Sequence, residues 1–120
     1  MTIERGFIEL AVEQWRLIRL LERLSERVPF ESQSRVQAQA RYAGSKLDAI
    51  LLDADMTLER FEGRLFEPGL PVTSLNSDEV PNDRPLLVQE TIEPAVLQNG
   101  RVLQLGKVTL REGNDDAFGN

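Results

Sequence analysis

The chain has no cysteine and no histidine. It can therefore form no disulfide bond and no thiolate nucleophile, and it lacks the commonest general base and the commonest zinc ligand. It has no apolar run near the roughly 20 residues that a membrane span needs, and its N-terminus lacks the basic start and small-residue cleavage site of a secretory signal. We expect a cytoplasmic protein with no membrane segment, no metal, no cofactor and no enzymatic activity.

Basic residues are scarce in the C-terminal half. Residues 1–66 carry ten basic and eleven acidic side chains, whereas residues 67–120 carry four and nine, so the second part holds −5 of the net charge of −6. A nucleic-acid-binding domain needs a basic stripe that neutralises phosphates. The sequence has no such stripe, so we expect no nucleic-acid partner. Acidity of this size serves solubility, or else it attracts a basic protein partner.

A heptad series with steps of four and three begins near the N-terminus. Its members are Ile3, Phe7, Leu10, Gln14, Leu17, Leu21, Leu24 and Val28. This spacing is typical of a helix that packs along a partner helix, and we predict a helix over about residues 2–28. A second stripe of Ile8, Val12, Trp15 and Ile18 makes the apolar surface wider than a two-stranded coiled coil needs. The two stripes together favour a helical bundle, or a dimer of helical hairpins, with Phe7, Leu10, Gln14, Leu17, Leu21 and Leu24 at the dimer interface.

Pro29 closes this helix, and a second helical pattern follows. Its apolar positions are Val36, Ala40, Ala43, Leu47, Ile50, Ala54, Leu58, Phe61 and Leu65. They predict a second helix over about residues 34–65, with Leu47 and Leu58 in the dimer interface. Whether Gly44 interrupts this helix stays open. Gly63, Pro68, Gly69 and Pro71 end the helical region.

Beyond Leu70 the apolar period changes towards two, which indicates strands. Asn99-Gly100 between two apolar runs predicts a hairpin, because a type I′ turn needs positive φ at both central residues. A two-residue turn would place Leu97 opposite Val102 and Gln98 opposite Arg101. The predicted fold class is α+β, with paired helices over residues 1–66, a small all-β domain over 67–112, and a disordered tail over 113–120.

The hairpin region resembles a known family. Ala-Val-Leu-Gln-Asn-Gly-Arg-Val-Leu at 95–103, followed by Lys-Val-Thr-Leu at 107–110, is similar to the C-terminal β-domain of GrpE, the nucleotide exchange factor of DnaK-type chaperones. Phe66-Glu67-Pro68 is similar to the Phe-Asp-Pro that follows that family's helical bundle. The chain departs from the family at Ala95-Val96 in place of Gly-Tyr, at Gln104-Leu105-Gly106 in place of Arg-Pro-Ala, at Pro71 in place of His, and in its shorter first helix.

The resemblance implies a homodimer that binds the ATPase domain of a DnaK-type chaperone and accelerates ADP release. Such a factor stabilises the open nucleotide cleft by differential binding, without bond chemistry. The resemblance also implies partner contacts at Asn99, Gly100, Arg101 and Leu110. Arg101 would donate hydrogen bonds to the chaperone, and Leu110 would make an apolar contact.

Two other interpretations stay open. A dimeric coiled-coil adaptor with a small β-module would share these features and exchange no nucleotide. Residues 49–57 also resemble the first motif of haloacid-dehalogenase-type phosphotransferases, an apolar strand followed by Asp-x-Asp-x-Thr. There Asp53 would be the nucleophile and Asp55 the general acid, and both would help to hold magnesium. That fold needs a doubly wound sheet, and the 65 residues after Asp55 mostly do not alternate strand with helix.

Overall fold

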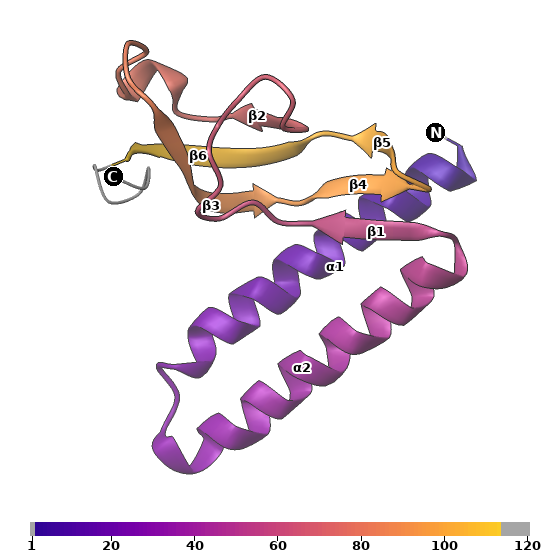
Figure 1. The fold of residues 1–120 in the computed structure, drawn as a ribbon. Coiled ribbons are helices and arrows are strands. Elements are labelled where there is room, and N and C mark those ends of the chain that lie inside the picture. Colours follow the sequence, from indigo (N-terminus) through magenta and orange to yellow (C-terminus); the bar gives the residue numbers. More distant parts are fainter. Residues whose placement is uncertain (1, 114–120) are drawn as a thin grey trace. The chain divides into compact units, whose positions relative to one another are not determined.

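The structure is a computed structural model that describes residues 2–113 (Figure 1). The chain divides into two compact units, one ending at Thr57 and the other beginning at Leu58. The sequence pattern predicts this boundary after residue 66, whereas the first unit ends at Thr57. The predicted disordered tail, apart from Gly113, lies outside the described residues.

The first unit is a hairpin of two helices, α1 (Ile3–Ser25) and α2 (Phe30–Asp53). Thr2 caps α1, because its Oγ1 accepts a hydrogen bond from the backbone N–H of Arg5 at 3.0 Å. Pro29 is the N-cap residue of α2, where its fixed φ and its missing N–H are tolerated. Helix α2 is continuous through Gly44. Neither helix combines the length and the apolar content needed to cross a membrane.

The second helix is shorter than predicted. The sequence pattern predicts a helix over residues 34–65, whereas α2 ends at Asp53. Asp55 adopts a left-handed conformation with φ of 58°, and Met56–Glu59 then form strand β1. Phe61, which the pattern places on the helix, belongs to the core of the second unit instead. Tertiary packing therefore overrides the helical spacing of Ala54, Leu58 and Phe61.

The strands form two three-stranded sheets with the orders β1-β4-β5 and β2-β6-β3, and all of them except the first two residues of β1 belong to the second unit. Strand β2 runs parallel to β6, and β3 runs antiparallel to it. A short 3-10 helix, η1 (Ser77–Glu79), follows β2. The class α+β predicted from the sequence is confirmed. The strands not yet given are β2 (Val72–Ser74), β3 (Leu86–Glu93), β4 (Ala95–Gln98), β5 (Arg101–Gln104) and β6 (Gly106–Glu112).

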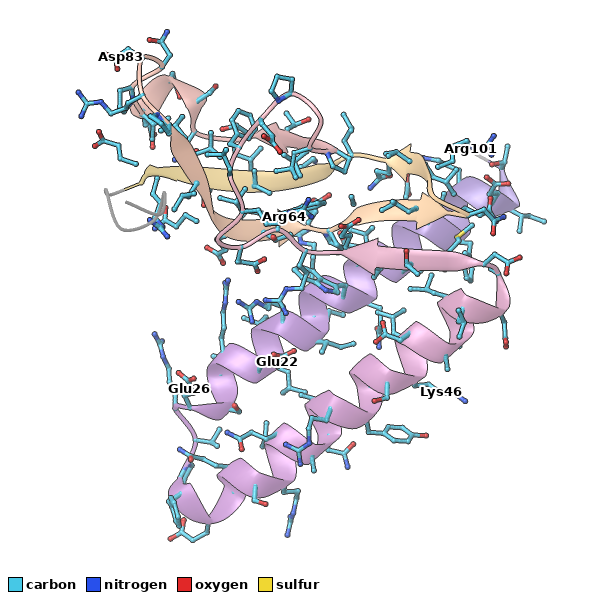
Figure 2. The ribbon with its side chains drawn as sticks, viewed as in Figure 1. Glu22, Glu26, Lys46, Arg64, Asp83 and Arg101 are labelled. Atoms are coloured by element: carbon cyan, nitrogen blue, oxygen red, sulfur yellow. The ribbon has the colours of Figure 1, made fainter. Side chains whose placement is uncertain are left out.

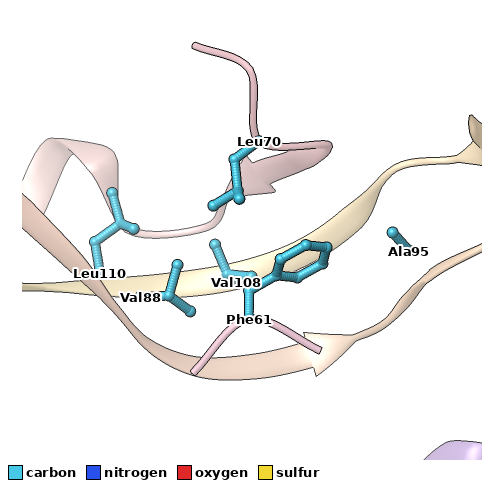
Figure 3. Packing of buried hydrophobic residues seen from close by; sticks show 6 residues of the cluster. All are labelled: Phe61, Leu70, Val88, Ala95, Val108 and Leu110. Carbon is cyan, nitrogen blue, oxygen red and sulfur yellow. The ribbon is translucent and has the colours of Figure 1, made fainter. Parts of the chain in front are cut away.

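An apolar cluster lies in the core of this unit. Figure 3 shows its members, Phe61, Leu70, Val88, Ala95, Val108 and Leu110. They come from loops and from three different strands, so the core exists only once the sheets have formed. Two polar side chains complete the fold around this core. Thr91 accepts a hydrogen bond from the backbone N–H of Phe61 at 3.0 Å, and Asn76 bonds both backbone groups of Leu110 at 2.8 and 2.9 Å.

Candidate functional site

The tip of the β4–β5 hairpin is the candidate site. Asn99 and Gly100 have φ angles of 54° and 80°, as a type I′ turn requires. Leu97 pairs with Val102 and Gln98 pairs with Arg101, so the predicted register is confirmed. The turn residues and Arg101 are exposed. Local turn chemistry thus fixes the shape of the surface that carries Arg101 (Figure 2).

The base of the hairpin is held by the core. Ala95, the first residue of β4, is fully buried in the apolar cluster, and Leu97 packs against that cluster. On the other side, β6 begins at Gly106, where an added Cβ would lie 2.9 Å from the backbone nitrogen of Ala95. The backbone N–H of Gly106 donates to the carbonyl of Pro71 at 2.9 Å. The hairpin is therefore fixed at its base and exposed at its tip.

Arg101 is available for a partner in a way that its neighbours are not. Of the other basic side chains in the described part of this unit, four form ion pairs. The Arg101 side chain has neither an ion pair nor a hydrogen bond to any of residues 2–113. Its guanidinium can offer five donors to an external carboxylate or carbonyl. The four pairs are Arg60–Glu62 at 2.9 Å, Arg64–Glu59 at 3.1 Å, Arg84–Glu112 at 2.9 Å and Lys107–Glu93 at 3.7 Å.

Leu110 does not belong to this exposed surface. It is 2% exposed and packs in the apolar cluster with Phe61 and Val88. Side chains alternate along a strand, and β6 turns Val108 and Leu110 inward while Lys107 and Arg111 face outward. The partner contact assigned to Leu110 is therefore wrong. Val102, the residue after Arg101 in β5, is 42% exposed, but side chains alternate along a strand, so it lies on the opposite face from Arg101.

The heptad series on α1 is the second exposed feature. Ile3, Leu10, Leu17 and Leu24, spaced seven residues apart, are 93%, 72%, 60% and 45% exposed. Gln14 is also exposed, and Phe7 and Leu21 are half-buried. The buried face of α1 is instead the second stripe, which includes Ile8, Val12 and Ile18. At about 100° per residue, the two stripes lie roughly 135° apart around the helix.

Two residues assigned to the dimer interface do not lie on this exposed stripe. Leu47 is 8% exposed, so its side chain is already buried within the chain. Leu58 is half-buried and lies in β1, beyond the end of α2. The helical spacing that joins the two residues in sequence therefore does not place them on one helix face.

The phosphotransferase motif does not take the form that its chemistry needs. Residues 49–53 are helical, so the apolar strand that would deliver the nucleophile is not formed by these residues. Asp53 is the last residue of α2, and Asp55 lies in the left-handed turn after it. Across residues 2–113, no group of three Asp or Glu side chains is arranged to hold a metal ion. This interpretation is set aside.

Glu62 has the one clearly perturbed carboxyl among the described residues. Burial raises its pKa, but hydrogen bonds from the Thr91 hydroxyl, from Arg60 and from its own backbone N–H lower it more, to about 2. The Thr91 Oγ1 donates to Glu62 Oε2 at 2.6 Å, and the backbone N–H of Phe61 donates to the same oxygen at 3.1 Å. With its acceptor sites occupied, Glu62 acts as a structural carboxylate beneath the core.

Comparisons of the chain with protein-family models, with curated proteins and with solved structures find no match.

Proposed function

We propose that the protein is a GrpE-like co-chaperone. In this proposal a homodimer binds the ATPase domain of a DnaK-type chaperone through the β4–β5 hairpin and accelerates ADP release. The observation that carries the proposal is Arg101, an exposed guanidinium with no partner among the described residues 2–113, presented on a turn of fixed geometry. The Asn-Gly-Arg-Val-Leu sequence of that hairpin is also where the chain resembles the family most closely.

The hairpin suits a protein contact in two respects. Arginine presents a planar fork of donors that matches a carboxylate bidentately. The turn needs no ordering on binding, because both of its positive φ angles are already adopted. A preorganised contact loses less conformational entropy than a flexible loop.

Exchange would follow from differential binding. A partner accelerates nucleotide release only if it binds the open state of the chaperone more tightly than the closed state. A tenfold shift towards the open state requires a difference of about 1.4 kcal/mol in binding free energy, which one charge-assisted hydrogen bond can supply. No group of this protein needs to transfer a proton or form a covalent bond.

The proposed homodimer would use the exposed heptad series of α1. Leu10, Leu17 and Leu24 form a stripe at coiled-coil spacing, and Gln14 interrupts it once. A single polar residue in such a stripe favours registers in which it meets a polar partner. Dimerisation would present two hairpins to the chaperone and raise the chance that one is engaged.

The test is the release of a fluorescent ADP analogue from the DnaK-type chaperones of the source organism. We expect the wild-type protein to accelerate release and Arg101→Ala to lose at least about tenfold of that acceleration. Arg111→Ala removes another exposed arginine of the same unit, outside the hairpin, and is expected to behave like wild type. Equal losses in both variants would mean a general charge effect.

Two further results would redirect the proposal. Chaperone binding without acceleration, measured by calorimetry, would assign the protein as a coiled-coil adaptor that uses the same hairpin. Neither binding nor acceleration by a folded protein, with every chaperone of that class in the organism, would reject the exchange function.

A further inference from the structure

Strand β2 forms an open edge of its sheet. In the order β2-β6-β3 it is a terminal strand, so among residues 2–113 it pairs with a strand only on its β6 side (Figure 1). The N–H and C=O groups along a strand edge are a template on which another extended chain can pair. This edge is separate from the tip of the β4–β5 hairpin, so its role does not depend on the proposed exchange function.

The hydrogen bonds to β6 show which backbone groups this edge leaves free. The backbone C=O of Pro71 and the backbone N–H of Leu75 both bond to β6, each at 2.9 Å. Because alternate residues of a parallel strand bond to the same neighbour, Val72 and Ser74 turn their backbone groups away from β6. The N–H of Val72 donates to the carbonyl of Leu70 at 2.8 Å. The carbonyl of Val72 and both backbone groups of Ser74 are therefore left for an added strand.

A cavity of about 210 Å³ lies beside Val72, the first residue of β2. Val72 lines this cavity and also packs against the apolar core, so the cavity opens on the inward face of the sheet. Neighbouring side chains on one face of a sheet lie about 5 Å apart, so the residue of an added strand next to Val72 would point into the cavity. The volume is several times the roughly 30 Å³ share of a water molecule, which leaves room for one apolar side chain. The other lining residues are Phe66, Glu67, Pro68 and Leu70.

The chain around this edge is acidic. Residues 65–83 contain four carboxylates and no basic side chain. Glu67, which lines the cavity, is exposed, and its side chain forms no hydrogen bond or ion pair with any of residues 2–113. A positive charge beside the apolar residue of an incoming chain would meet this carboxylate. The charge complement of the edge is therefore a basic segment.

We propose that the β2 edge binds an extended, basic segment of a partner protein by strand addition. The segment pairs its main chain with Val72 and Ser74, places an apolar side chain in the cavity and presents a lysine or arginine to Glu67. Main-chain hydrogen bonds of this kind give affinity, whereas pockets for side chains give specificity. Because β2 is short, the edge alone offers few hydrogen bonds, and an acidic segment is repelled by the carboxylates.

The test uses random peptides displayed on phage, which are selected on the immobilised full chain and then measured as free peptides by calorimetry. We expect the selected peptides to share an apolar residue with a lysine or arginine within about two positions of it. Replacing that basic residue with glutamate should weaken binding at least about tenfold, because glutamate and Glu67 repel each other.

Two variants of Ser74 test the main-chain pairing. Ser74→Pro removes the outward N–H, a change that strand edges tolerate. Ser74→Ala is the matched control, because both variants lose the hydrogen bond from the Asn76 N–H to Ser74 Oγ at 3.3 Å, but only alanine keeps its own N–H. We expect Ser74→Pro to bind the selected peptides at least about tenfold more weakly than Ser74→Ala does. Circular dichroism shows whether each variant is folded.

Glu67→Gln tests the charge contact without touching the edge. It should weaken the selected peptides severalfold, and it should not weaken their analogues in which glutamine replaces the basic residue. An exposed side chain without internal contacts can be changed without unfolding the chain, so this variant stays informative if Ser74→Pro does not fold.

The proposal is overturned if no peptide is enriched, or if acidic peptides are enriched as strongly as basic ones. It is equally overturned if the selected peptides bind folded Ser74→Pro as tightly as Ser74→Ala, or if Glu67→Gln leaves their affinity unchanged. Self-association of the wild type that Ser74→Pro abolishes, without peptide binding, would assign the edge to a second copy of the chain instead. None of these results depends on chaperone binding or ADP release.

Discussion

Glu62 shows how one side chain stabilises the second unit. Its carboxylate accepts hydrogen bonds from Thr91, from the backbone of Phe61 and from Arg60 Nη2 at 2.9 Å. Burial raises the pKa of Glu62, but these donors lower it by more, so that the pKa falls from 4.5 to about 2. The folded pKa is below the unfolded one, so this stabilisation is fully present above about pH 4.5 and is lost as the pH falls through about 2.

Glu62→Gln is therefore expected to destabilise the protein in a pH-dependent way. At pH 7 the loss should be about 2 kcal/mol, after a discount for the solvent-exposed part of the side chain, and it should shrink as the pH falls from 4.5 towards 2. Urea denaturation at pH 7, 4 and 2.5 measures the free energies of unfolding of the wild type and of Glu62→Gln. Glu67→Gln, an exposed neighbour, is the control and should match wild type throughout. An equal loss for Glu62→Gln at every pH would mean that shape, and not charge, is what matters at this position.

At the scale of elements, local chemistry was predictable and non-local packing was not. Asn99-Gly100 determines its own turn, so the pairing of Leu97 with Val102 followed from the sequence. The end of α2 did not follow from the sequence, because Phe61 continues the helical spacing of the apolar residues but packs in the core of the second unit. Strand β2 was also missed. It has three residues and pairs in parallel with β6, more than 30 residues away, which no local pattern encodes.

Gly44 in the middle of α2 gives a prediction about helix stability. The helix is continuous there, and an added Cβ would have no atom within 4 Å. Gly44→Ala should therefore raise the free energy of unfolding by about 0.5–1 kcal/mol, because alanine loses less backbone entropy in a helix. Gly106→Ala is the opposite case and should destabilise by at least about 1 kcal/mol, since its Cβ would meet the backbone of Ala95 at 2.9 Å. Urea midpoints measure both changes, and a loss of stability in Gly44→Ala would mean that a partner covers this face of α2.

At the scale of the whole molecule, two exposed surfaces stand out: the tip of the β4–β5 hairpin and the heptad series of α1. The sequence predicts each of them only in part. Arg101 was identified from the hairpin motif and is exposed, whereas Leu110 was misplaced because the inward side of β6 depends on its pairing with β3. Helix α1 carries two apolar stripes of similar spacing, and the sequence cannot say which one packs within the chain. Burial of the stripe that contains Ile8 and Val12 leaves the heptad series exposed. An exposed apolar stripe of this regularity is what a helix-pairing surface presents before it is occupied.

Leu17→Glu tests whether that surface joins two copies of the chain. A charge in the middle of the stripe should raise the dimer dissociation constant at least about a hundredfold, because an unpaired carboxylate would be buried at the interface. Sedimentation velocity across a range of protein concentrations measures this constant, and helical content should stay unchanged because Leu17 is 60% exposed in the single chain. Leu52→Glu is the matched control, since Leu52 is a 67% exposed leucine of α2 that lies outside the heptad series, and it should leave the dimer intact. The thermal midpoint of the wild type should rise with protein concentration, as expected when association stabilises the fold, and that of Leu17→Glu should not. A wild-type protein that sediments as a monomer at about 100 μM, in the concentration range where stable coiled-coil dimers persist, would contradict the dimer and with it the paired arrangement of the two hairpins.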